Sequence, residues 1–186
     1  MLIPLTALWL PILLSAVAVF MASSVIHMVI GWHNNEFAKL ANEDEVMDAL
    51  RKGSVEPGDY VFPRAEDPAD FGSEETQKKW AAGPSGRLTI YPAGPINMGK
   101  NLLHWFFYTV VISLFAGYLG AATLGPGVNY LSVFQVVGCA AFLGYAGSMW
   151  QDVIWWGARP VSALKSIADG FVYALLTAGV FGWLWP

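Results

Sequence analysis

Two histidines are placed where they could ligate a cofactor. His27 lies about one helical turn before the end of the first long apolar stretch, and His104 about one turn after the start of the second. If these stretches cross a membrane in opposite directions, the two imidazoles lie at a similar depth. Neutral imidazole is a common ligand of haem iron, and it can also ligate a chlorophyll-type magnesium. The competing interpretation, which we prefer, is that both rings are interfacial and bind water, lipid headgroups or a carbonyl. His33 is expected to be solvated.

Asp152 and Asp169 are the only acidic residues outside the segment 33–100. An acidic residue close to a membrane span is a functional candidate by default. Both also have simple partners, because Lys165 and Asp169 have i, i+4 spacing and Arg159 is close to Asp152 across a short loop. We therefore expect a cluster of ion pairs here rather than a proton relay.

No residue pattern in the chain matches a catalytic motif. Cys139 is the only cysteine, which excludes an internal disulfide and every multi-cysteine metal site. The sequence accordingly predicts a protein that is not an enzyme, has no metal site and requires no cofactor. Bound lipid, carotenoid, bacteriochlorophyll or haem would be compatible with it.

The elements that position these residues are four apolar stretches, roughly 11–30, 102–124, 130–149 and 166–185, each long enough to cross a bilayer. The chain is 55% hydrophobic and only 13% charged, with a mean hydropathy of +0.47. Soluble domains usually have about 25% charged residues. The first stretch lacks a preceding basic region, so we expect a retained helix and no cleaved signal peptide. The predicted fold is an all-α membrane protein, a four-transmembrane-helix bundle with a small cytoplasmic α+β insertion.

The basic residues predict how the chain crosses the membrane. All ten lie either in 33–100 or between the third and fourth stretches. Because positive charge is retained in the cytoplasm, both termini are predicted to be periplasmic and 33–101 cytoplasmic, in a bacterial inner membrane. This topology divides most of the tryptophans into two interfacial belts. The inner belt is Trp32, Trp105, Trp150, Trp155 and Trp156, and the outer belt is Trp9, Trp183 and Trp185.

The domain boundaries follow from this arrangement: helix 1 in 1–32, the insertion in 33–101 and helices 2 to 4 in 102–186. Within the insertion, capping residues predict helices over 43–52 and 73–82, and short strands over 60–62 and 87–91 that can pair. The insertion is too small for a large core of its own, so it should rest on the membrane surface or on a partner. Its net acidic charge argues against nucleic acid.

Small residues recur at four-residue spacing in the apolar stretches, for example Ala116/Gly120 and Ala174/Ala178. Such pairs let transmembrane helices approach closely. The pattern predicts close packing, either within the chain or with other transmembrane subunits.

Three segments carry a family resemblance. They are Asn97-Met98-Gly99-Lys100 ahead of His104-Trp105-Phe106, the phrase 142–146 (FLGYA) and the phrase 169–179 (DGFVYALLTAG). The chain resembles, over nearly its whole length, a family of small four-span bacterial inner-membrane proteins without a known activity. The resemblance implies the same fold and supplies no catalytic residue.

These observations favour a non-catalytic accessory subunit that scaffolds a larger bacterial membrane complex, with photosynthetic reaction-centre or light-harvesting and respiratory assemblies as leading cases. Its expected partners are other transmembrane subunits and lipids. The first alternative is a haem- or chlorophyll-binding electron-transfer subunit that uses His27 and His104. The second alternative is a small transporter.

Overall fold

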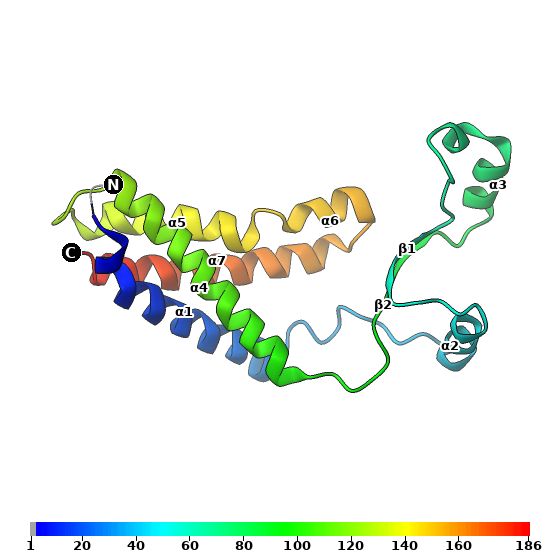
Figure 1. The fold of residues 1–186 in the computed structure, drawn as a ribbon, viewed down its shortest axis with the longest axis horizontal. Coiled ribbons are helices and arrows are strands. Elements are labelled where there is room, and N and C mark those ends of the chain that lie inside the picture. Colours follow the sequence, from blue (N-terminus) through cyan, green and yellow to red (C-terminus); the bar gives the residue numbers. More distant parts are fainter. Residues whose placement is uncertain (1–2) are drawn as a thin grey trace. The chain divides into compact units, whose positions relative to one another are not determined.

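A computed structural model describes residues 3–186, and most of the chain is helical (Figure 1). Contacts divide the chain into two compact units. The first, Met1–Phe37 with Asn97–Pro186, is called the bundle here, and the second, Ala38–Ile96, is called the insertion. Each is described by itself.

The bundle contains the predicted spanning helices. They are α1 (Trp9–Ser24), α4 (Met98–Thr123), α5 (Tyr130–Ala146), α6 (Met149–Trp156) and α7 (Pro160–Trp183). A 3-10 turn, Leu5–Leu8, precedes α1, and a π-helical turn, Val25–Ile30, follows it. Four segments are long and apolar enough to cross a membrane: Leu5–Ile30, Met98–Thr123, Tyr130–Trp156 and Pro160–Trp183. The described chain therefore has the helices of a multi-pass membrane protein.

The third spanning segment is longer than the sequence predicted. The helix pauses at Gly147, whose N–H still donates to the Leu143 carbonyl at 3.0 Å, and then continues as α6. It ends at Gly157, which has a φ of +64° and therefore a left-handed conformation that glycine tolerates best. Pro160 then opens α7 at its first turn, where a missing N–H costs nothing. The predicted end near residue 149 is wrong, because the spanning segment continues to Trp156.

Small residues allow the helices of the bundle to pack closely. Helix α1 packs against α4 and α7, and α5 packs against the same two helices. Gly117 of α4 faces the Phe181 ring of α7, where an added Cβ would lie 2.8 Å from a ring carbon. On α7, Ala174 and Ala178 are buried. The small-residue pairs of α4 and α7 are thus used within the chain.

Polar side chains in the bundle interior bind one another or the backbone. Ser15 of α1 donates to Ser113 of α4 at 3.0 Å. The Trp105 indole N–H donates to the Ser23 hydroxyl at 2.8 Å. Such bonds tie helices together where lipid surrounds them. Next to these bonds lies an apolar core that includes the fully buried side chains of Leu8, Val19, Val133, Val137 and Phe181.

The insertion contains two α-helices, a 3-10 turn (Ala69–Gly72) and a two-stranded sheet. The helices are α2 (Glu43–Lys52) and α3 (Glu74–Ala82), and the strands are β1 (Gly58–Phe62) and β2 (Gly86–Ile90). The strands pair antiparallel, with Gly58 opposite Ile90 and Phe62 opposite Gly86. The Ser73 hydroxyl caps α3 by accepting from the Thr76 N–H at 3.2 Å. Both helices and the strand pairing agree with the prediction to within a few residues.

Candidate functional site

His27 lies in the π-helical turn that ends the first span. A π turn contains one extra residue, which rotates the following side chains relative to an α-helix, and such turns are frequent at functional sites. The Gly31 N–H accordingly donates to the carbonyl of Ile26, five residues earlier, at 3.0 Å. The His27 side chain remains half exposed.

Gly31 reverses the chain directly after this turn. Its φ is +63°, and an added Cβ would lie 2.8 Å from the Asn34 side-chain nitrogen. Two turn hydrogen bonds follow, from Asn34 N–H to the Gly31 carbonyl and from Glu36 N–H to the His33 carbonyl, both at 3.0 Å. The chain therefore folds back, and this brings His33 to α7.

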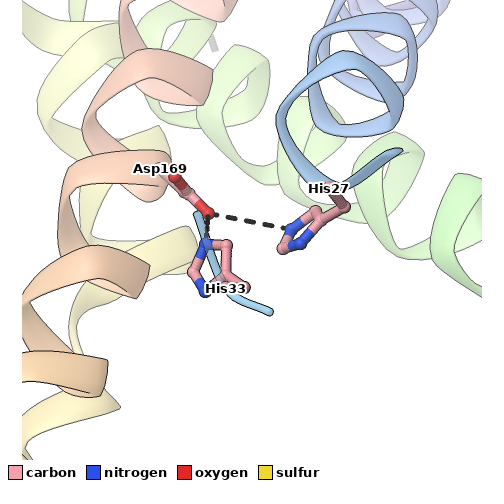
Figure 2. Close-up of side chains that lie close together, drawn as sticks. All are labelled: His27, His33 and Asp169. Atoms are coloured by element: carbon pink, nitrogen blue, oxygen red, sulfur yellow. Dashed lines mark hydrogen bonds and ion pairs between the residues drawn. The ribbon is translucent and has the colours of Figure 1, made fainter. Parts of the chain in front are cut away.

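Three side chains from separate parts of the chain meet there (Figure 2). The Nε2 atom of His33 lies 2.8 Å from Oδ2 of Asp169, and Nε2 of His27 lies 3.7 Å from the same oxygen. The two imidazole rings face each other with centroids 4.6 Å apart and an interplanar angle of 32°. We call His27, His33 and Asp169 the histidine cluster.

Glu36 completes the surroundings of His33. Its Oε1 atom lies 2.9 Å from Nδ1 of His33, so each ring nitrogen faces a carboxylate oxygen. A neutral imidazole carries one N–H and satisfies only one of these carboxylates. The second contact therefore needs one more proton, on the ring or on the facing carboxylate, or a cation between the ring and Asp169.

The His33 geometry corrects one prediction. From the sequence we expect a solvated ring, but the His33 side chain is only 13% exposed and both nitrogens have partners. The reason is the reversal at Gly31, which turns a residue next to the membrane span back onto α7.

Basic residues at the start of α7 hold this reversed segment. The Lys165 ammonium group donates to the Trp32 carbonyl and, at 2.8 Å, to Oδ1 of Asn35. The Arg159 guanidinium donates to the Asn35 carbonyl at 3.1 Å. Both side chains therefore bind the segment 32–36. Asp169 faces the two histidines.

The other predicted site residues lie outside the histidine cluster. His104 is exposed on α4. The ligand atom of His27 lies close to those of His33 and Asp169, and His104 is not part of this cluster. Asp152 lies on α6. A cofactor held jointly by His27 and His104 stays a prediction.

Six of the eight belt tryptophans are largely exposed, as side chains in contact with lipid or interface would be. They are Trp9, Trp32, Trp150, Trp155, Trp156 and Trp183. Trp105 and Trp185 instead pack against the bundle core. The Trp185 indole N–H donates to the Gly125 carbonyl at 3.1 Å, which fixes the end of the chain to the turn between α4 and α5.

The histidine cluster was not predicted, because each histidine was considered along its own helix. Its usable signal was the spacing His27, His33 and Glu36 around Gly31, together with an acidic residue in the last span. Chemically, the cluster offers two imidazole nitrogens and a carboxylate oxygen, all within 4.8 Å of one another. Such a set can hold a proton or a metal ion.

Comparisons with known proteins place no further constraint on the chain. No family model, no curated protein and no solved structure matches it.

Proposed function

We propose that this chain is a non-catalytic accessory subunit of a larger membrane complex and that its insertion docks on a partner protein. The observation that carries the proposal is the surface of the insertion. In the insertion, every residue of which is described, only Ala65 and Thr76 are buried. A unit with so small a core gains little stability from burial alone.

The insertion exposes many large apolar side chains instead. They are Leu40, Val46, Met47, Tyr60, Val61, Phe62, Phe71, Tyr91 and Ile96, each at least 37% exposed. Exposed apolar surface on this scale is typical of a protein or membrane interaction site. Burial of these side chains against a partner would supply the stability that the insertion lacks.

Charge favours a protein partner over the lipid surface. The insertion carries more acidic than basic residues, including three acids in the first turn of α2. The cytoplasmic leaflet is negatively charged and attracts polybasic segments, not acidic ones. On the predicted topology, an acidic and apolar insertion is therefore better suited to a protein surface.

The bundle has a second region suited to contact with other transmembrane subunits. A groove of about 340 Å³ runs between α5 and α7, and three small residues, Gly138, Ala174 and Ala178, contribute to its lining. Its lining also includes Phe134, Phe142, Phe171 and Leu175, so the groove offers an apolar surface to the side chains of a neighbouring helix. The groove adds support to the proposal, which rests mainly on the exposed apolar surface of the insertion.

Site-specific photocrosslinking in native membranes tests the proposal. A photoreactive phenylalanine at Phe62 or Phe71 should form a discrete product with another subunit. At Lys78, an exposed polar position of α3, it should not. Mass spectrometry of the product identifies the partner and thus the assembly, photosynthetic, respiratory or other. Products with lipid alone, or with the chain's own bundle, would contradict a partner subunit.

A charge substitution gives a second measurement. Phe62→Asp should release the chain from the complex during native purification, because burial of a carboxylate at an apolar interface is costly. The matched variant Lys78→Asp should remain associated. Equal retention of both variants would count against docking through the insertion.

A further inference from the structure

We infer that His27, His33 and Asp169 form a binding site for one divalent transition-metal ion, with Zn²⁺ as the representative. The three residues come from the π-helical turn, the reversed segment and α7, and their donor atoms lie within 4.8 Å of one another (Figure 2). The inference goes beyond the accessory role and does not require a partner subunit.

The distances between donor atoms suit a small ion. Zn²⁺ binds histidine nitrogen at about 2.0–2.1 Å and carboxylate oxygen at about 2.0–2.2 Å, so two ligands of a tetrahedral ion lie about 3.3 Å apart. The observed separations from Oδ2 of Asp169 are 2.8 Å to His33 and 3.7 Å to His27. Adjustments of about half an ångström bring these two pairs to the required distance, and the ligand nitrogens of His27 and His33 lie within 4.8 Å of each other.

Glu36 provides an independent indication from outside the cluster. Histidines that bind metal almost always donate their other ring N–H to a carboxylate, carbonyl or water, which fixes the tautomer. His33 has this arrangement, because its Nδ1 faces Oε1 of Glu36 at 2.9 Å. The Nε2 lone pair of that tautomer points toward Asp169 and is available to a metal. Glu36 is therefore a positioning residue and not a ligand.

The burial of Asp169 gives a second indication. Its side chain is 6% exposed, and Oδ1 is buried without a hydrogen-bond partner among the described residues. Burial of an ionised carboxylate is costly unless a cation or hydrogen bonds compensate for it. A divalent ion on this carboxylate supplies that compensation, and it also resolves the surplus of acceptors around His33.

The ligand set indicates the class of metal. Imidazole nitrogen suits zinc and iron, and two histidines with one carboxylate are ligands of both. His27 is half exposed, so the remaining coordination positions are open to water. With three protein ligands and open positions, the site does not resemble a closed structural zinc site.

Metal titration of the purified full-length chain in detergent tests the inference. We expect one equivalent of Zn²⁺ to bind in competition with a chromophoric chelator, and Co²⁺ to give a visible spectrum of a site with nitrogen and oxygen ligands. Asp169→Asn and His33→Gln should abolish both signals. Glu36→Gln should retain the stoichiometry and weaken binding about 10- to 100-fold.

His104→Gln is the matched control, because His104 is an exposed histidine outside the cluster. It should bind metal like the wild type. Absence of binding to the wild-type chain, or equal loss in His104→Gln and His33→Gln, would overturn the inference. His27→Gln keeps the hydrogen bond between His33 and Asp169. Metal binding by this variant therefore tests the site even if Asp169→Asn and His33→Gln fail to fold.

Chemical labelling of the unmodified chain needs no variant. Diethyl pyrocarbonate reacts with accessible imidazole, and both His27 and His104 are exposed. Bound Zn²⁺ should slow the modification of His27 and leave that of His104 unchanged. Equal rates at His27 with and without Zn²⁺ would leave the cluster as a hydrogen-bonded group only and refute the metal site.

Discussion

Tyr173 lies one turn after Asp169 on α7, and its hydroxyl is buried without a partner among the described residues. The hydroxyl of Tyr145 on α5 is likewise buried without a hydrogen-bond partner among the described residues. The two tyrosine rings are in contact, with centroids 5.5 Å apart. A buried hydroxyl without a hydrogen bond costs about 1–3 kcal/mol. These residues add polar atoms to the bundle beyond the histidine cluster.

Removal of one hydroxyl measures that cost. Tyr173→Phe should leave the free energy of unfolding unchanged or raise it by about 1 kcal/mol, because no hydrogen bond is lost. Tyr108→Phe is the control: its hydroxyl donates to the Gly144 carbonyl at 2.9 Å, so its loss should cost about 0.5–1.5 kcal/mol. Thermal unfolding in detergent compares the two. A clear loss of stability in Tyr173→Phe would show that an internal water or ion holds its hydroxyl.

The sequence indicated some residues of the histidine cluster individually, but it did not predict that they lie together. It singled out His27 and Asp169. It did not find the contact between His33 and Asp169, because their proximity depends on the left-handed conformation of Gly31 and on the packing of α1 against α7. The spacing around Gly31 indicates the first, but the packing of α1 against α7 is not encoded in local spacing.

At the scale of elements, local chemistry predicted most boundaries. Ser73 caps α3 as expected, and α2 spans Glu43–Lys52 as its acidic start and basic end indicate. The extension of the third span into α6 was missed. The sequence there contains Gly147, which weakens a helix locally, but the structure continues the helix after a short break. A residue that weakens a helix locally does not by itself determine whether the helix ends there.

The close approach of α5 and α7 gives a prediction at this scale. A Cβ on Gly170 would lie 2.9 Å from the Cβ of Ala146 and 3.3 Å from that of Tyr145. These atoms are attached directly to the backbone of α5, so Gly170→Ala must push the helices apart and should cost about 1–3 kcal/mol.

Gly179→Ala on the same helix is the control for that substitution. Its nearest neighbour would be the Tyr130 hydroxyl at 3.6 Å, an ordinary contact, so stability should stay the same or rise by up to about 1 kcal/mol. Thermal unfolding of both variants in the same detergent measures the difference. Equal midpoints would show that α5 and α7 are not packed as closely as described.

For the whole chain, hydropathy predicts the number of membrane spans, whereas charge predicts their orientation. Hydropathy predicted four spans, and the structure has four helices that are long and apolar enough to cross a membrane. Charge predicted which side each loop faces, and this orientation remains to be measured. The insertion's lack of a core was anticipated from its size alone, whereas its exposed apolar surface required the structure.

The orientation can be measured with reporter fusions. Because all ten Lys and Arg residues lie in the segment 33–100 or between the third and fourth spans, both regions should be cytoplasmic. A reporter that is active only in the periplasm should work after Pro186 or within the turn 125–129, and should be inactive near Gly72. A cytoplasmic reporter should give the opposite pattern, and equal expression of all fusions is the control.

Lys39 and Lys100 lie near the two ends of the segment 33–100. Replacing both by Gln should weaken the orientation preference without reversing it, because the short loop between the third and fourth spans keeps Arg159 and Lys165. Periplasmic activity near Gly72 in the wild-type chain would contradict the predicted topology, and with it the predicted cytoplasmic side of the histidine cluster and of the proposed partner.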